Sequence, residues 1–310
     1  MTDKEVSING LPEAHWSDGI VGGYLRLAAS GYIPARWYLP DLLPRSERAA
    51  TTGHLSLEIV SHCWNYAHLL DFQLSSLVLF PPNKMSVTMT VYYCREDQAT
   101  VDMLAFFGQQ ELVHVKWNWR ALPRQQLFRR SIGRNHAARN TAADWIWFTD
   151  CDLLFRDKTI DTLGDLLQGR QDKLVYPSYE KVTPLLLDDH PMLNADAHEP
   201  AIVDIDSSVF YPTDRTRATG PLQIVHGDVA RTNGYCESLP LYQTPSETWC
   251  KAHEDRAFRW LLRTKGTALE LPSVYRIRHT TKGRYTGTAV NTGLRSSIRR
   301  FTSWLSERRQ

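Results

Sequence analysis

Apolar residues alternate with polar ones at Leu55, Leu57 and Ile59, a period of two that predicts a β-strand. Apolar residues then recur at helical spacing from Leu70 to Val78, which predicts a helix. The two patterns go on alternating, with further strands expected at 85–93, 111–117 and 145–152 and helices at 100–107 and 131–142. Such alternation predicts an α/β fold in which helices cover both faces of a mostly parallel sheet.

The second half of the chain mixes both patterns. Strands are expected at 173–178, 201–211, 222–230 and 268–279, and helices at about 159–168 and 254–264. Residues 1–53 are rich in Gly, Pro and Trp, and their pattern assigns them no role. The chain is therefore divided into an N-terminal extension (1–53), an α/β domain (54–285) and a basic amphipathic tail (286–310).

Two carboxylates, Asp150 and Asp152, end the apolar run at 145–152. Ionised carboxylates are seldom buried without a partner charge or a metal. Open α/β sheets bind ligands at the carboxyl ends of their strands, and a strand that ends and turns can aim both carboxylates at one ion. Oxygen ligands suit Mg²⁺ or Mn²⁺. As a bare pattern D-x-D is weak, because solvated turns also produce it.

Composition narrows the class of protein. A chain of 310 residues, 42% of them hydrophobic, can bury a full core. The net charge of +2 does not indicate a nucleic-acid partner. Five cysteines with no C-x-x-C pair suggest neither a disulfide framework nor a zinc site. We expect a cytoplasmic protein, since no signal segment is visible and the apolar runs are shorter than the roughly 20 residues of a membrane-spanning helix.

Four motifs occur in an order that resembles a known family. They are "GRNHAARNTAADWIWFTDCDLLF", "VHGDVARTNGYCE", "TWCKAHEDRAFRWLLRTKG" and "VYRIRHTTKG". Together they look like nucleotide-sugar-dependent glycosyltransferases of the GT-A fold, family 2-like, with a C-terminal part similar to β-1,4-galactosyltransferases. The resemblance covers roughly residues 54–285 and implies a GT-A type, Rossmann-like sheet.

The resemblance implies a metal site. Asp152 matches the direct ligand, Asp150 lies nearer the ribose or a bound water, and His279 matches the metal-binding histidine. A histidine ligand shifts the preference toward Mn²⁺ over Mg²⁺. The family pattern has a Met shortly before this histidine, whereas this chain has Tyr275, Arg276 and Ile277 there. The alternative is that His279 belongs to a solvated basic strand.

The resemblance also implies a general base. Glu254 and Asp255 match an acidic pair at the start of a helix, of which Asp255 takes the acceptor proton in inverting enzymes. The positive end of the helix dipole would keep both groups ionised. The alternative is an ordinary helix first turn, where acidic residues are common. The implied contacts of the acceptor or the donor sugar are Trp249, His226, Gly227 and Asn233.

Contacts to the donor nucleotide are expected at the ends of the first strands and at the helix before the D-x-D. Each of these residues could equally be an ordinary surface residue. The candidates are Ser61, His62, Asn65, Glu96, Asp97, Arg134 and Asn135.

These observations favour a metal-dependent, inverting hexosyltransferase in polysaccharide biosynthesis, with a UDP-sugar donor and a glycan or lipid-linked acceptor. A nucleotidyltransferase on the same fold and a non-catalytic carbohydrate-binding protein, the latter suggested by 10 Trp and 13 Tyr, stay open. A phosphatase of the haloacid dehalogenase type would place Thr or Val where Leu154 stands.

The tail carries a further expectation. Four apolar residues at helical spacing are interleaved with arginines: Ile298, Phe301, Trp304 and Leu305. This pattern is typical of a helix lying on an anionic membrane surface, and equally of a packed helix with a solvated basic face.

Overall fold

An eight-stranded sheet forms the centre of the protein in the computed structural model, which describes residues 4–6, 8–187, 189–193, 199–249 and 253–280. The tail at 286–310 lies outside the described residues. In spatial order the strands are β1 (Lys4–Glu5), β4 (Val115–Ala121), β3 (Met85–Tyr93), β2 (Leu55–His62), β5 (Trp145–Phe148), β10 (Gln223–His226), β7 (Leu174–Pro177) and β11 (Thr267–Leu269). Only β10 runs antiparallel to its neighbours among these strands.

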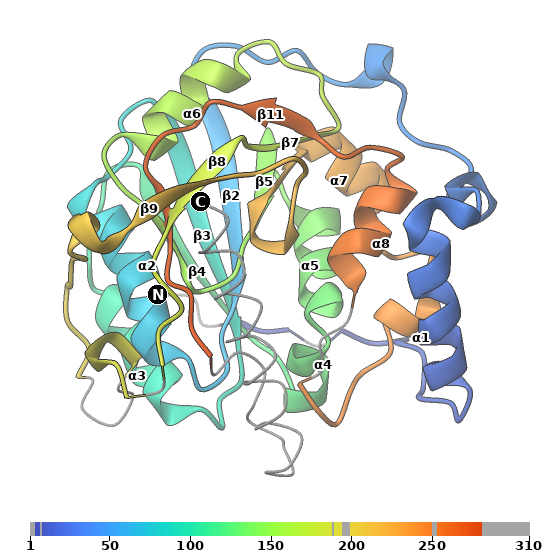
Figure 1. Ribbon diagram of the computed structural model, residues 1–310, viewed down its shortest axis with the longest axis horizontal. Coiled ribbons are helices and arrows are strands. Elements are labelled where there is room, and N and C mark those ends of the chain that lie inside the picture. The colour runs from blue at the N-terminus through green and yellow to red at the C-terminus, as the bar shows by residue number, and fades with distance from the viewer. Residues whose placement is uncertain (1–3, 7, 188, 194–198, 250–252, 281–310) are drawn as a thin grey trace.

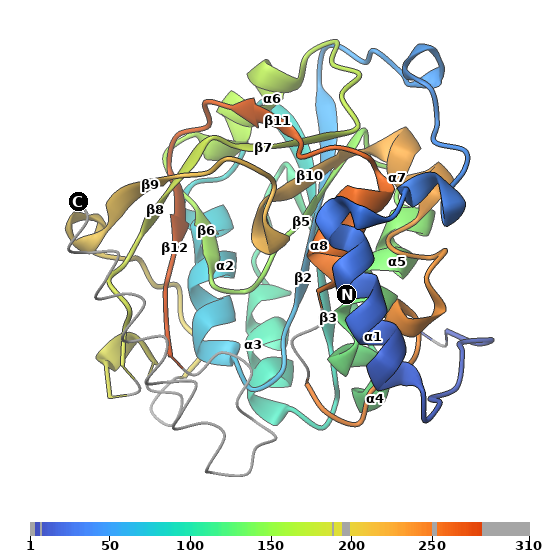
Figure 2. The ribbon, with the colours of Figure 1, turned by 45° about the vertical axis from the view of Figure 1, so that its right-hand side comes forward.

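Helices cover both faces of this sheet, as predicted. α2 (Ala67–Leu79) and α3 (Gln98–Phe107) lie on one face, and α5 (Arg130–Asn140), α7 (Gly227–Asn233) and α8 (Glu254–Leu261) lie on the other (Figure 1, Figure 2). The remaining α-helices of the described residues are α1 (Asp18–Leu27), α4 (Arg124–Phe128) and α6 (Thr159–Leu167). The expected α/β class with a mostly parallel sheet is therefore confirmed.

A second sheet has the order β6 (Leu153–Phe155), β12 (Val274–Arg276), β8 (Tyr179–Val182) and β9 (Tyr211–Asp214). Strand β6 begins in the turn that follows β5, and β12 pairs with it antiparallel so that Arg276 lies opposite Leu153. This pairing brings the last described residues of the chain back to the end of β5.

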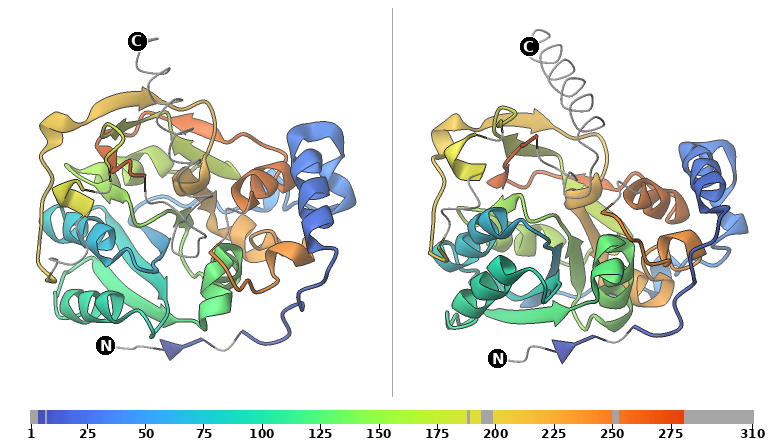
Figure 3. Two further views of the ribbon diagram at one scale, coloured as in Figure 1. Left: turned by 60° about the horizontal axis from the view of Figure 1, so that its bottom comes forward. Right: turned by 90° about the horizontal axis from the view of Figure 1, so that it is seen from below.

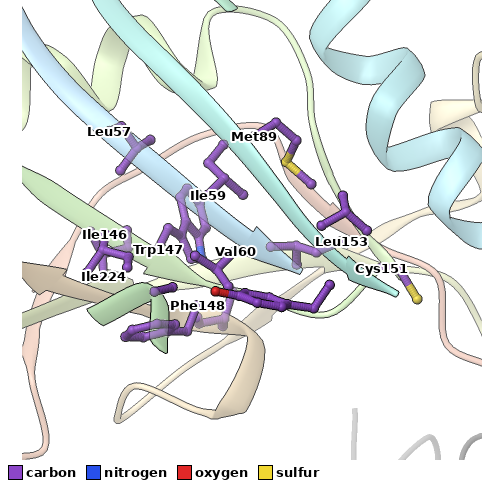
Figure 4. Close-up of a cluster of buried hydrophobic side chains, with 14 of the residues drawn as sticks. Leu57, Ile59, Val60, Met89, Ile146, Trp147, Phe148, Cys151, Leu153 and Ile224 are labelled. Atoms are coloured by element: carbon purple, nitrogen blue, oxygen red, sulfur yellow. The ribbon is translucent and has the colours of Figure 1, made fainter. Parts of the chain in front are cut away.

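The core lies where β2, β3, β5 and β10 meet (Figure 4). Strand β5 is buried along its whole length, because helices cover the sheet on both sides. The Trp147 indole packs among apolar side chains and donates its N–H to the Pro221 carbonyl at 2.9 Å. The four cysteines in the described part of the chain are free, in line with the absence of a disulfide pattern.

Several expected strands differ from the observed ones. The expected strand at 111–117 begins only at Val115, and the one at 145–152 ends at Phe148, so the D-x-D lies in a turn. The expected strand at 268–279 is split into β11 and β12 around Pro272, which cannot donate a ladder hydrogen bond. The expected strand at 222–230 becomes β10 followed by α7.

The strand expected at 201–211 is wrong. Asp206 accepts hydrogen bonds from the Ser208 backbone N–H at 2.9 Å and from its hydroxyl at 2.6 Å. This local cap forms a short 3₁₀ turn at Ser207–Val209, so the backbone turns before it can extend. Strand pairing starts only at Tyr211.

The described part of residues 1–53 packs against the α/β domain. β1 adds a parallel edge strand beside β4. The buried Arg48 guanidinium donates to the Gln171 carbonyl at 2.7 Å and to the Leu43 carbonyl at 2.7 Å. The Trp260 indole of α8 donates to the Ile33 carbonyl at 2.9 Å. Across the described ranges, no helix combines the length and apolarity that a bilayer crossing requires.

Replacing Gly227 by Ala should destabilise the protein, because a Cβ at this position would lie 2.1 Å from the Ala143 carbonyl oxygen. Backbone atoms cannot move aside as a flexible side chain can, so we expect a loss of about 1–3 kcal/mol in the free energy of unfolding. The matched control is Gly23→Ala in α1, where nothing lies within 4 Å. It should stabilise by about 0.5–1 kcal/mol because alanine is the better helix former. Urea unfolding measures both, and equal stabilities would contradict the packing described.

Candidate functional site

Asp152 and His279 come together although 127 positions separate them in the chain. The carboxylate Oδ2 of Asp152 and Nε2 of His279 are 3.7 Å apart, and both side chains are buried. The Ile277 N–H donates to the Asp152 carbonyl at 2.9 Å, which fixes the strand that carries His279. The Tyr66 ring packs edge-on against the imidazole, with ring centroids 5.4 Å apart. His279 is therefore not a residue of a solvated strand.

This pair fits two ligands of one divalent ion. Adjacent ligands of a six-coordinate ion lie about 3 Å apart and opposite ones about 4 Å, because each bond is about 2.1 Å long. The observed 3.7 Å does not exceed the larger value, so one ion can bridge the two atoms. Within the described ranges, no cluster of three or more His, Cys, Asp or Glu side chains could hold a metal. The remaining ligands would have to be water and substrate oxygens, which Mg²⁺ and Mn²⁺ commonly accept.

Asp150 faces cationic groups of α5. Its Oδ1 lies 2.8 Å from the Arg130 guanidinium and 3.3 Å from that of Arg134. Arg130 also lies 3.2 Å from the Glu254 carboxylate at the start of α8. Burial lowers the pKa of Arg130, but Asp150 and Glu254 outweigh that effect and raise it. One guanidinium therefore joins the end of β5 to the start of α8.

The two members of the acidic pair differ in their surroundings. Glu254 is buried and held by Arg130. Asp255 is about one-third exposed, with a side-chain exposure of 32%, and its Oδ2 lies 3.3 Å from the Arg259 guanidinium one turn later. Of the two, only Asp255 presents a carboxylate that a bound substrate can reach without displacing a buried ion pair.

Three half-buried or buried aromatic rings form a row beside this charged cluster. Trp64 follows β2, Phe128 ends α4, and Trp249 precedes α8. The ring centroids are 5.2 Å apart for Trp64 and Phe128 and 5.8 Å apart for Phe128 and Trp249, and both contacts are edge-on. Phe128 is buried, so within this aromatic row (Trp64, Phe128 and Trp249) the two half-buried indoles carry the apolar faces of the kind that stack on sugars and bases.

Arg134 has a structural role. It is 1% exposed, donates to the Tyr235 hydroxyl at 3.0 Å and to the Thr149 carbonyl at 3.2 Å, and stacks on the Tyr235 ring. Arg130, which the sequence analysis missed, is the more exposed of the two, with 20% of its side chain accessible. Its position four residues before Arg134 on one helix face was the available signal.

His62, at the end of β2, is buried and neutral. Its ring stacks on Tyr92 with centroids 5.0 Å apart, and a Cβ on Gly133 would meet its Nε2 at 2.3 Å. Burial and the nearby Arg134 and Arg130 lower the pKa of His62 well below its ordinary value. His62 therefore brings no positive charge to a diphosphate. Ser61 beside it is also fully buried.

The loops after β2 and β3 are joined by Asp97. Its Oδ2 accepts from the Asn65 N–H at 2.6 Å and from the Thr100 hydroxyl at 2.6 Å, and the carboxylate caps α3. This bond holds Asn65 at a φ of 54°. Glu96 is exposed and pairs with Arg124 at 2.9 Å. Asp97 is thus committed to loop structure, and Glu96 is the more accessible carboxylate for a base edge.

Two predicted contacts lie away from the D-x-D, and two others are hydrogen-bonded within the fold. β10 runs antiparallel to β5 with His226 opposite Trp145, so His226 and Gly227 lie at the far end of β5 from the D-x-D. His226 caps α7 and Gly227 packs on the backbone of Ala143, which corrects their assignment to the sugar site. Asn135 accepts from the Tyr235 N–H at 2.8 Å, and Asn233 donates to the Asp41 carbonyl at 3.0 Å.

No protein-family model matches the chain, and no curated protein matches it. Among solved structures, TarS 1–349 of S. aureus is 13% identical with a TM-score of 0.45, over 74% of this chain and 62% of that one. TarS with UDP-GlcNAc is 11% identical with a TM-score of 0.45, over 76% and 62%. A mannosyltransferase, PcManGT from Pyrobaculum calidifontis in complex with GDP-Man and Mn²⁺, is 16% identical with a TM-score of 0.42, over 86% and 70%. The chain thus spans less than two-thirds of the TarS structures.

Proposed function

We propose that this chain is a metal-dependent, inverting glycosyltransferase of the GT-A fold that moves a hexose from a UDP-sugar to a hydroxyl of a glycan or lipid-linked acceptor. The observation that carries the proposal is the Arg130 bridge. The Arg130 guanidinium contacts Asp150, which follows β5, and Glu254, the first residue of α8. Asp255 is the second residue of α8. This link between the two elements supports a metal and diphosphate side and a proton-accepting side within one site.

On the donor side, Asp152 and His279 would hold Mn²⁺ or Mg²⁺ through one oxygen and one nitrogen. A divalent ion there supplies Lewis-acid stabilisation of charge on the leaving diphosphate. Arg130 adds a fixed positive charge next to Asp150. The aromatic row offers ring faces for the base or the sugar.

On the acceptor side, Asp255 would accept the proton of the attacking hydroxyl. The acceptor oxygen forms a bond to the anomeric carbon as that carbon's bond to the diphosphate oxygen breaks, and the nucleoside diphosphate leaves with the electron pair. A single displacement inverts the anomeric configuration. Asp255 lies in the first turn of α8, and its Oδ2 is 3.3 Å from the Arg259 guanidinium.

Thermal unfolding with nucleotides tests the donor side. UDP with Mn²⁺ should raise the Tm of the wild-type protein, because a ligand that binds only the folded state stabilises it. Asp152→Ala should lose this protection. Asp165→Ala is the matched control, since Asp165 is an exposed carboxylate that pairs with Lys84. Protection by UDP that survives a chelator, or that persists in Asp152→Ala, would contradict the metal assignment.

Asp255→Asn tests the acceptor side. The amide keeps the shape and can still accept from Arg259, but it cannot take a proton, so kcat should fall by about 10²- to 10⁴-fold. UDP and Mn²⁺ protection should persist in this variant. Proton NMR of the product should show a β-linkage from an α-linked donor. An α-linked product or near-normal turnover would remove Asp255 from the mechanism, and release of pyrophosphate would indicate a nucleotidyltransferase instead.

A further inference from the structure

Large apolar side chains stand on the outer side of α1. Trp16 is 83% exposed, Ile20 is 70% exposed and Leu27 is 54% exposed. At 100° per residue Ile20 and Leu27 fall on one face of the helix, on the side away from the buried Leu25, and Trp16 lies in the turn before the helix. Helix α1 is therefore apolar on both its inner and its outer side.

The exposed surface continues past the end of α1. The chain turns through Ala28–Tyr32, where Gly31 has a φ of 101°, and then enters the short turn Ala35–Trp37. Tyr32 is 76% exposed and Trp37 is 68% exposed. The α1 ridge is defined here as Trp16, Ile20, Tyr24, Leu27, Tyr32 and Trp37. Its position lies within the segment to which the sequence pattern assigned no role.

The ridge is larger than ordinary surface scatter. Single exposed apolar residues are normal, but a contiguous set marks an interaction surface. The ridge combines aliphatic residues with Trp and Tyr, the residues enriched at membrane interfaces. Helix α1 lies at the periphery of the molecule, beside α8 (Figure 3).

The charge of this segment favours an anionic partner. From Trp16 to Trp37 the chain contains two arginines, Arg26 and Arg36, and one acidic residue, Asp18, whose carboxylate accepts a hydrogen bond from the His15 N–H at 3.0 Å. Both arginines are exposed. A juxtaposition of Arg with inserted Trp, Tyr and aliphatic side chains is the pattern by which peripheral helices bind anionic bilayers.

We propose that the α1 ridge rests on the surface of a lipid bilayer that carries anionic headgroups. The contact would orient the candidate active site, because α1 and the turn after it pack on α8. The Trp260 indole of α8 donates to the Ile33 carbonyl at 2.9 Å, and its ring lies 5.3 Å from that of Tyr38. Helix α8 begins with Glu254 and Asp255. Resting on the proposed function, this arrangement selects a lipid-linked acceptor over a soluble glycan.

Vesicle flotation of the full chain tests the proposal. The wild type should float with vesicles of phosphatidylcholine and phosphatidylglycerol and bind less to phosphatidylcholine alone. The double variant Ile20→Asn/Leu27→Asn leaves every charge in place and should bind the mixed vesicles about tenfold more weakly, because it removes two inserted apolar side chains. The matched control is Val113→Asn/Val209→Asn, which changes two exposed valines elsewhere and should bind as the wild type does.

Two results would overturn the proposal. Equal vesicle binding by the ridge variant and the wild type would show that another part of the chain, such as the tail, carries the contact. A wild-type dimer in sedimentation that the ridge variant converts to monomer, with no vesicle binding, would assign the ridge to a second copy of the chain. Protection of the ridge variant by UDP and Mn²⁺ is measured in parallel, so that failure of the membrane contact and failure of the donor site are told apart.

Discussion

A guanidinium held between two carboxylates is the constraint on which the candidate site depends. Glu254 is buried, and a buried carboxylate without a partner is expensive. Arg130 supplies that partner and contacts Asp150 as well. Removing one member of a buried ion pair typically costs about 3–5 kcal/mol. This ion pair fixes the positions of α5, the end of β5 and the start of α8 relative to one another. It also fixes the backbone of Asp255, which directly follows Glu254.

The second sheet provides the other half of the site. Asp152 begins the turn into β6, and β12 pairs with β6, so the residues after β12 pass directly beside Asp152. Backbone pairing of β12 and Ile277 therefore determines the position of His279. The 3.7 Å between its Nε2 and the Asp152 carboxylate follows from this register. The Asp152–His279 pair and the Glu254–Asp255 pair are thus positioned by different interactions, the first by strand pairing and the second by an ion pair.

The spacing of apolar residues along the chain predicted the helices and strands whose formation depends on neighbouring residues. Period-two and helical spacing located β2, α2 and β3. Two expected strands are interrupted, one at Pro272 and the other at the Asp206 cap. Strand direction is not a local property. The family resemblance implied that His226 and Gly227 lie at the site, and the antiparallel course of β10, which leaves no trace in its hydrophobic pattern, places them at the far end of β5. Trp64, Phe128 and Arg130 were missed for the same reason, since only the folded chain brings them together.

The proposed function depends on an ion shared between Asp152, His279 and a nucleotide diphosphate. The most direct measurement is anomalous diffraction at the manganese absorption edge from crystals grown with Mn²⁺ and UDP. The account predicts one strong anomalous peak within bonding distance, about 2.1–2.3 Å, of the Asp152 carboxylate and His279 Nε2, in contact with diphosphate oxygens. A peak bound elsewhere, or UDP bound with no manganese between these two side chains, would contradict it.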